Sequence, residues 1–386
     1  MEVGLFCHPD DIAARLDLGA FRTSGLRRLI VNVLYHDWAC HAPLSSARPL
    51  RRERGGVSAV PMHAVYPPGL APRPCGDSHL AAVMANAADA DIAVDAWTVG
   101  LHRDDLASAC EPDLSTVVDA FGTRQSSWLC PSSPASMQYL EAHARDIAAH
   151  GFARLVLEGC HYPLLPHGGA HERDLSRLPE TVMSQLELCF CKACCARYAA
   201  AGVEPEQFAA TIRQDVGDTV GHRTGTSLAI VPALRRQRVL ELLSAIRAAA
   251  PQMDTMFADQ PAIAGAAFRT GEPGRRRIAD IHAAAGIDPS AIATATSRML
   301  ALAYFRSPRD LAEHIEAYLD AGVPASSLTV ALRATPPDCD SIADMREKLR
   351  LIAALGVDEV AFYELTQMDA ADLALTREAI EVAAAT

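Results

Sequence analysis

The sequence predicts a single (β/α)8 barrel, in which eight parallel strands alternate with helices. Short apolar or β-branched runs recur along the chain, and most are followed by an amphipathic helical pattern. In two segments near the C-terminal end of the sequence, AGVPASSLTV and LGVDEVAFYE, the end of a helix is followed by a glycine and then by an apolar strand. This order is typical of the helix-to-strand loops of such units. A length of 386 residues suits one barrel with long loops.

The expected strands are the apolar runs Val3–Cys7, Leu29–Leu34, Ile92–Val99, Ala153–Leu157, Met253–Phe257, Leu300–Phe305, Leu328–Leu332 and Glu359–Tyr363. Helices are expected over Pro9–Leu18 and Met137–His150, and from near Pro308, Ser341 and Asp369. A loop rich in proline, glycine and arginine is inserted at about 39–76, and several helices follow the fourth strand at about 164–250. An open doubly wound sheet is the alternative, but no Gly-x-Gly-x-x-Gly follows the first strand.

Composition excludes several function classes. The net charge of −12 would repel a phosphate backbone, so we expect no nucleic acid partner. No run of 18 apolar residues occurs, and the first residues lack the features of a signal peptide, so we expect a cytoplasmic protein without a membrane partner. The 11 cysteines are then expected as reduced thiols or metal ligands. The sequence leaves open whether the chain forms a homo-oligomer.

Candidate site residues follow from the fold, because barrel active sites lie at the C-terminal ends of the strands. Residues at or just after those ends that are ionisable, polar or aromatic are His8, Asp10, His36, Asp37, Trp97, His102, Glu158, His161, Tyr162, Asp259, Gln260, Tyr304, Arg333 and Glu364. Asp95, within the third run, is a further candidate. We expect them to bind substrate or to catalyse. Any single one could instead be a solvated loop residue, but the number of such groups favours a functional site.

Glu158 is the expected general acid, because it directly follows the apolar run Leu155–Leu157 and burial there would raise its pKa. The second carboxylate stays open among Asp259, Glu364, Asp95 and Asp37, with Asp259 and Glu364 preferred as catalytic partners. The separation of the pair would distinguish retaining from inverting hydrolysis, at about 5 Å against about 6.5–9.5 Å.

A glutamate at the end of the fourth strand resembles the arrangement in the large glycoside hydrolase clan with (β/α)8 barrels. The segments AWTVGLH, LCPSSP and LEGCHYPLLPHGGAHE also resemble those of uncharacterised bacterial glycoside-hydrolase-like barrels. Two departures are clear: Leu157 stands where the clan usually has asparagine, and the seventh-strand segment Leu328–Pro337 contains no glutamate.

The resemblance implies a carbohydrate-active enzyme acting on a small sugar or glycoside by acid and base catalysis. Two other functions stay open: a barrel that recognises a sugar-like natural product but catalyses elimination or isomerisation, and a non-catalytic sugar-binding barrel. Aromatic rings such as Trp38, Trp97, Tyr162 and Tyr304 would stack on sugar faces.

Cys189, Cys191 and Cys194 form Cys-x-Cys-x-x-Cys, a thiol density that suits tetrahedral zinc once a fourth ligand is supplied. The triplet resembles the zinc cluster of family 42 β-galactosidases, which implies a fourth cysteine from the loop after the third strand. We expect Cys110 as this fourth ligand. Cys130 lies in the same loop and is an alternative, and Cys195 is a third option. Such zinc would be structural, and the alternative is a group of buried thiols.

His167 and His171 have a spacing that could chelate a metal on a helix, but Gly168 and Gly169 lie between them. We therefore expect these two histidines to contact substrate, with plain solvent exposure as the alternative. No organic cofactor is expected.

Overall fold

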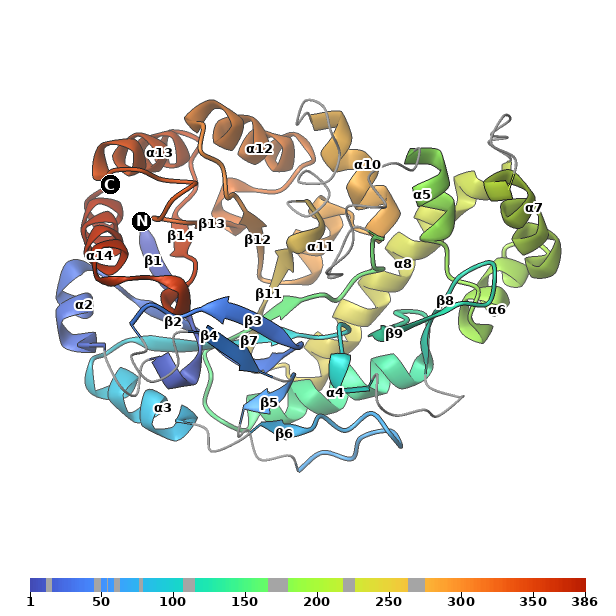
Figure 1. Ribbon diagram of the computed structural model, residues 1–386, viewed down its shortest axis with the longest axis horizontal. Helices are drawn as coiled ribbons and strands as arrows, with labels where there is room; N and C mark the ends of the chain where they lie inside the picture. The colour runs from blue at the N-terminus through green and yellow to red at the C-terminus, as the bar shows by residue number, and fades with distance from the viewer. Residues whose placement is uncertain are drawn as a thin grey trace.

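The computed structural model confirms the closed barrel of parallel strands surrounded by helices (Figure 1). It describes residues 1–11, 16–44, 50–53, 55–58, 63–75, 79–106, 115–165, 180–217, 226–262 and 275–386. In this part of the chain the eight barrel strands are β1 (Glu2–Cys7), β2 (Arg28–Tyr35), β7 (Ala93–Val99), β10 (Arg154–Glu158), β11 (Asp254–Asp259), β12 (Arg298–Leu302), β13 (Leu328–Leu332) and β14 (Glu359–Phe362). They pair in parallel in sequence order, and β1 also pairs with β14, which closes the barrel.

Several of the helices that cover the barrel begin at a residue whose side chain caps them. Those described are α2 (Leu18–Ser24), α3 (Leu80–Asp89), α4 (Pro134–Ala148), α8 (Thr226–Ala249), α10 (Arg275–Ala285), α11 (Pro289–Ala295), α12 (Pro308–Asp320), α13 (Ile342–Ala354) and α14 (Ala370–Ala385). Ser307, Ser341 and Asp369 cap the last three with their side chains, as the sequence led us to expect. Residues 9–11 are helical, as expected for the start of the helix Pro9–Leu18, and residues 12–15 lie outside the described part. A further helix, α2, starts at Leu18.

Two insertions extend the barrel. The region expected as a loop at 39–76 contains strand structure: β3 (Trp38–His41) pairs with β4 (Leu50–Glu53), while β5 (Gly56–Ser58) pairs with the end of β2 and with β6 (Pro74–Cys75). Between β10 and β11 lie α5 (Glu180–Leu186), α6 (Lys192–Ala200), α7 (Pro205–Gly217) and α8. With the hairpin of β8 (Thr116–Val118) and β9 (Arg124–Leu129), helices α5, α6 and α7 lie on one side of the barrel, at the right in Figure 1.

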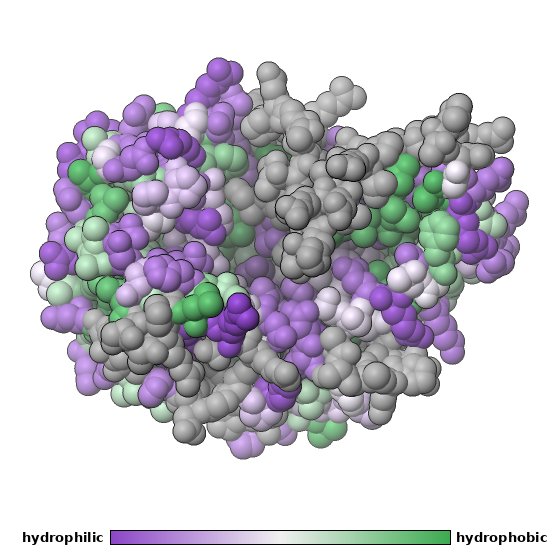
Figure 2. Space-filling view, in the orientation of Figure 1, coloured by the Kyte–Doolittle hydropathy of each residue, from purple (hydrophilic) through white to green (hydrophobic). Residues whose placement is uncertain are grey.

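Among the described residues on the face shown in Figure 2, most are hydrophilic, and the hydrophobic ones form small separate groups. Such scattered apolar side chains are normal on soluble surfaces. No helix in the described ranges combines the length and apolar composition needed to cross a membrane.

The barrel interior is layered, because alternate residues of each strand point inward. The middle layer is apolar and includes Phe6, Ile30, Trp97, Val156, Met256, Leu300, Ala331 and Ala361. Two residues further toward the C-terminal ends, the interior becomes polar at Glu158, Arg333 and Tyr363. The apolar layer therefore separates the two ends of the barrel.

The N-terminal end of the interior is closed by ion pairs. Arg154 Nη1 lies 2.7 Å from Glu359 Oε1, and Arg298 Nε lies 3.1 Å from Glu359 Oε2. Asp95, expected near the substrate, belongs to this layer instead: its Oδ2 accepts a hydrogen bond of 2.8 Å from Arg28 Nε. Asp95 points inward like Trp97, but two residues earlier on β7, and is therefore below the apolar layer.

We expect Glu359→Gln to lower the free energy of unfolding by about 3–5 kcal/mol, because it leaves Arg154 and Arg298 without their shared buried counter-charge. The neighbouring Asp358→Asn is the matched control. Asp358 also pairs with Arg298, but its side chain is 60% exposed, so its loss should cost less than about 1 kcal/mol. Urea unfolding of both variants checks this, and equal small losses would show that the inner ion pairs contribute little.

Candidate active site

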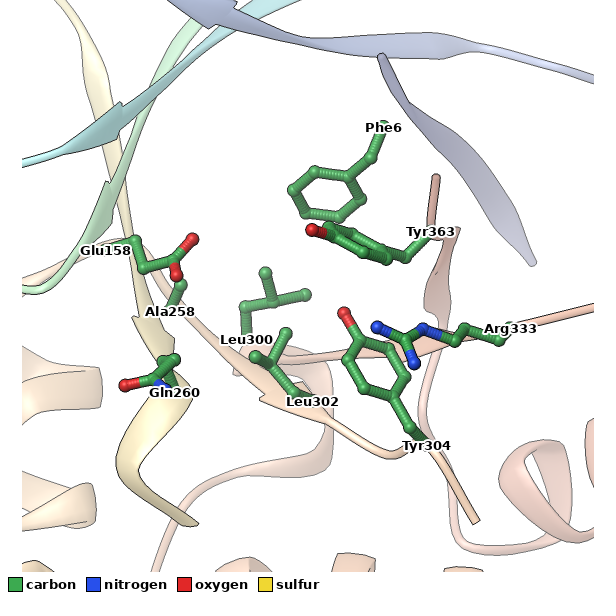
Figure 3. Close-up of a pocket in the computed structure, with 9 residues that line it drawn as sticks. All are labelled: Phe6, Glu158, Ala258, Gln260, Leu300, Leu302, Tyr304, Arg333 and Tyr363. Atoms are coloured by element: carbon green, nitrogen blue, oxygen red, sulfur yellow. The ribbon is translucent and has the colours of Figure 1, made fainter. Parts of the chain in front are cut away.

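A pocket of about 230 Å³ opens at the C-terminal end of the barrel interior. Its lining residues come from most of the barrel strands or from just beyond them: Phe6, Glu158, Ala258, Gln260, Leu300, Leu302, Tyr304, Arg333 and Tyr363. Glu158 and Gln260 project from one side, and Arg333, Tyr304 and Tyr363 from the opposite side (Figure 3). The pocket thus has an apolar floor and polar groups on facing walls, as small-molecule sites commonly do.

Glu158 is the last residue of β10, two positions beyond Val156 of the apolar layer. Burial raises the pKa of Glu158 to about 7, although a hydrogen bond from Trp97 opposes that shift. In this hydrogen bond Trp97 Nε1 donates to Glu158 Oε2 at 2.7 Å. The carboxyl group therefore holds a proton up to near neutral pH and can donate it into the pocket.

Glu364, just after β14, is a second buried carboxylate at the same end of the barrel. His8 Nε2 lies 2.9 Å from Glu364 Oε1, and Gln367 Nε2 donates to Oε2 at 3.0 Å. Burial acts to raise the pKa of Glu364, but His8 and hydrogen bonds from Tyr363 and Thr366 outweigh it and hold the pKa below its ordinary value. Glu364 is therefore ionised under conditions in which Glu158 keeps its proton.

His8 connects Glu364 to an aromatic wall. Its ring stacks on Trp38 with centroids 4.4 Å apart and lies 5.9 Å from the Trp97 ring. Trp97 in turn holds Glu158, so the two glutamates are joined through His8 and Trp97. Glu158 lines the pocket, and Glu364 is near enough for its charge to act on Glu158.

Two more of the expected residues, His36 and His102, form part of a ring stack that extends from the mouth toward β9. Centroid distances are 4.2 Å for Tyr35 and His36, 4.5 Å for His36 and His102, and 4.9 Å for His102 and Trp128. Burial lowers the pKa of His36 to about 4, so its ring is neutral at physiological pH. The exposed Asp37 beside them has a loop role: its backbone N–H donates to Asp104 Oδ2 at 3.0 Å.

The structure places Asp259 outside the pocket, although the sequence suggested it as a partner of Glu158. Ala258 points into the barrel and Asp259 points outward, since neighbouring residues of a strand face opposite sides. Its Oδ2 lies 2.5 Å from His282 Nε2 and accepts a hydrogen bond of 2.8 Å from Tyr318. These contacts attach the end of β11 to the surrounding helices.

Other expected site residues also lie away from the pocket. The Tyr162 hydroxyl is 2.6 Å from Ser132 Oγ, and Arg235 covers the Tyr162 ring, which places this tyrosine under the helical insertion. His161 is buried against Trp128, with ring centroids 5.5 Å apart. His167, His171 and Cys110 lie outside the described residues.

Sequence reasoning missed Tyr363 and Phe6 as pocket residues. Strand periodicity is the signal that could have found them, because each lies two positions from another inward-facing residue: Tyr363 follows Ala361, and Phe6 follows Gly4, whose added side chain would meet Ile30 in the interior. By the same alternation Asp259 faces away from the pocket, because it directly follows the inward-facing Ala258.

A second feature is a cluster of four thiols beside the helical insertion. The Sγ atoms of Cys130, Cys189, Cys191 and Cys194 all lie within 4.8 Å of one another. Cys130 Sγ is 3.5 Å from Cys194 Sγ and 3.7 Å from Cys189 Sγ. Four sulfurs about 2.3 Å from one zinc ion would be separated by similar distances, so the cluster could hold such a metal ion. Cys130 is the fourth thiol of this cluster.

Comparisons with known proteins find similarity in fold but not in sequence. No protein-family model matches the sequence, and no curated protein matches it. The catalytic domain of a β-amylase from Paenibacillus polymyxa superposes with a TM-score of 0.53 at 11% identity, covering 98% of this chain and 97% of that one. The C-terminal domain of a putative chitinase from Desulfitobacterium hafniense gives 0.51 at 8% identity, covering 98% of both chains.

A cold-adapted β-galactosidase from Rahnella sp. R3 gives a TM-score of 0.53 at 12% identity, covering 99% of this chain but 55% of that one. At these identities the likeness shows the fold alone. This chain therefore shares the barrel fold of several glycoside-hydrolase structures.

We expect Glu158→Gln to change the pH dependence of stability. The pKa of Glu158 rises from an ordinary 4.5 to about 7 in the fold. Glu158 then contributes stability that is fully present below pH 4.5 and is lost as the pH rises through 7. The variant should gain about 2–3 kcal/mol in unfolding free energy relative to wild type between pH 4.5 and pH 8. Urea unfolding at both pH values measures this gain.

The control is Glu378→Gln, which removes a carboxylate whose side chain is 52% exposed. It should show no comparable pH-dependent gain. A difference between Glu158→Gln and wild type that stays constant with pH would contradict the raised pKa.

Proposed function

We propose that the pocket cleaves the glycosidic bond of a small glycoside, with Glu158 as the general acid and Glu364 as the ionised carboxylate. The observation that carries this proposal is the split between the two groups: burial raises the pKa of Glu158 to about 7, while His8 and neighbouring donors hold the pKa of Glu364 below its ordinary value. Two carboxyl groups with divergent pKa values at one site supply an acid and a base at the same pH.

The walls of the pocket suit a sugar ring. Tyr304 and Tyr363 line it with aromatic rings whose centroids lie 5.4 Å apart. Gln260 adds an amide that can bind hydroxyl groups. A volume of about 230 Å³ is below the roughly 300–1,000 Å³ of sites for drug-sized ligands, which favours a single sugar unit.

In the proposed reaction Glu158 gives its proton to the oxygen that leaves the sugar. The bond between the sugar carbon and that oxygen breaks, and positive charge develops on the ring. Glu364 then stabilises this charge or takes a proton from the water that attacks the carbon. His8 would act as a positioning residue, because it holds Oε1 of Glu364 and keeps the carboxylate ionised.

We expect Glu158→Gln to reduce turnover of an alkyl glycoside by about 10²–10⁴, because it removes the transferable proton but keeps the size of the side chain. The loss should be much smaller for a 2,4-dinitrophenyl glycoside, whose leaving group needs no proton. Glu364→Gln should reduce turnover of both substrates, since its charge is needed whichever group leaves. Wild-type turnover should fall as the pH rises above about 7, where Glu158 loses its proton.

Asp259→Asn provides the matched control, because Asp259 lies outside the pocket and contacts His282 and Tyr318. It should lower the melting temperature and leave turnover within a few fold of wild type. Near-normal turnover of alkyl glycosides by Glu158→Gln would refute the acid assignment.

We also propose that Cys130, Cys189, Cys191 and Cys194 bind one structural zinc ion. The four thiols come from two segments, the turn before α4 and the start of α6, so a shared metal would fasten the insertion to the barrel. Cys195 takes no part in this set, because its Sγ donates to the backbone oxygen of Phe190 at 3.2 Å. Glu158 and Glu364 belong to a different part of the fold, so the reaction would not use this metal.

Purified protein is expected to carry about one zinc ion per chain, and removal by a strong chelator should lower its melting temperature because thiolate ligation is coupled to folding. Cys130→Ser should reduce the zinc content. Cys339→Ser should not, since Cys339 is buried elsewhere and its Sγ donates a hydrogen bond to the backbone oxygen of Ser341 at 3.3 Å. Metal analysis and thermal unfolding provide the two readouts. A metal-free preparation of full stability would exclude the site.

A further inference from the structure

Arg333 is the cation that the described residues place on the wall of the pocket. It follows β13 directly, and its guanidinium lies 4.2 Å from the centre of the Tyr304 ring and 5.2 Å from that of Tyr363. These two tyrosines hold the planar group in place opposite Glu158 (Figure 3). Stacking on aromatic rings orients a guanidinium but leaves its N–H donors unused.

The donors on this wall have few acceptors. Arg333 Nε is buried and has no hydrogen-bond partner among the described residues, and the same is true of the Tyr304 hydroxyl. Arg333 forms an ion pair with Asp338, whose Oδ2 is 3.8 Å from Nη1, beyond hydrogen-bonding distance. Buried donors without acceptors are unfavourable in a folded protein, and at a pocket wall they mark a place for a ligand acceptor.

The charge around the pocket leaves Arg333 able to attract an anion. Glu158 is neutral below about pH 7. The ionised Glu364 pairs with His8, whose Nε2 lies 2.9 Å from Glu364 Oε1. Asp338 and Lys348 are the charged groups on the far side of Arg333: the backbone oxygen of Asp338 accepts from Lys348 Nζ, so this lysine partly offsets the Asp338 charge. Lys348 also pairs with Asp344 at 3.0 Å, and Asp338 Oδ2 stays 3.8 Å from Arg333 Nη1. Among the described residues that line the pocket, Arg333 is the cation that faces the substrate.

We propose that the sugar unit in this pocket carries a carboxylate, as in a uronic acid, which Arg333 and Tyr304 bind. A guanidinium fork and a nearby hydroxyl match the two oxygens of a carboxylate. One cation balances a monoanion better than a phosphate dianion, and the pocket of about 230 Å³ favours the smaller group. This inference rests on the proposed function, because it names the substrate class of the same site.

The test measures binding, which does not require the acid. Titration calorimetry with wild-type protein at pH 6 compares D-glucuronate, D-galacturonate and D-mannuronate with glucose, galactose and mannose, and with the 6-phosphates of these sugars. We expect at least one uronate to bind about tenfold to a hundredfold more tightly than its neutral parent, as charge-assisted hydrogen bonds to a partly buried cation would give. It should also bind more tightly than the corresponding phosphate.

In Arg333→Gln the preference for the uronate should fall to within about twofold of the neutral sugar. Arg346→Gln is the matched control, because it removes an arginine on α13 whose side chain is 47% exposed and should keep the preference. The comparison of ligands on wild-type protein decides the matter even if Arg333→Gln fails to fold. Equal binding of every uronate and its neutral parent, or preference for the phosphates, would overturn the proposal.

Hydrolysis is measured separately, with α- and β-linked 4-nitrophenyl uronides on wild type and Glu158→Gln. Binding of a uronate that depends on Arg333 without any hydrolysis would support the present inference while contradicting the proposed glycosidase activity. Hydrolysis of neutral glycosides at the same efficiency as uronides would overturn the inference and leave the glycosidase activity standing. The two proposals therefore fail in different ways.

Discussion

Closure of the parallel sheet between β1 and β14 is the constraint on which the rest of the structure depends. Side chains fill the interior of a closed eight-stranded barrel, so each inward side chain must either be apolar or find a partner. At the N-terminal end that partner is an opposite charge, as Glu359 provides for Arg154 and Arg298. In the middle the side chains are apolar and pack against one another.

The same constraint produces the chemistry at the other end. Glu158 lies directly above the apolar layer with Trp97 as its hydrogen-bond donor, and burial therefore keeps it protonated up to near neutral pH. Glu364 is also buried, but it lies after the strand, where His8 and the side chains of Thr366 and Gln367 can reach it. One barrel end thus holds a proton donor and an ionised carboxylate, and the difference between them comes from the number of polar partners that each one finds.

The sequence predicted the fold well and the site in part. Eight apolar runs were sufficient to locate the strands, because each strand is buried on both faces and reads as a continuous hydrophobic segment. Glu158, Tyr304 and Arg333 were expected at the mouth and line the pocket there. Asp95 and Asp259 were also expected there, but the position of a residue near a strand end gives neither its depth in the barrel nor the face on which it lies.

Contacts between distant segments were harder to predict. The pairing of His8 with Glu364 joins the first and last strand ends, and it depends on barrel closure. The spacing of Cys189, Cys191 and Cys194 indicated a cluster, but only the fold shows that Cys130 approaches it. The inward direction of Tyr363 could have been read from strand alternation, whereas its contact with Arg333 could not.

The central claim is that burial and polar partners set opposite protonation states for the two glutamates. Infrared difference titration of the carboxyl groups tests this most directly when wild type is compared with Glu158→Gln and Glu364→Gln. We expect a carboxyl signal that titrates at about pH 7 and is missing only in Glu158→Gln. We expect a second signal that titrates below the ordinary glutamate range and is missing only in Glu364→Gln. Titration of Glu158 at its ordinary value of 4.5 would contradict it.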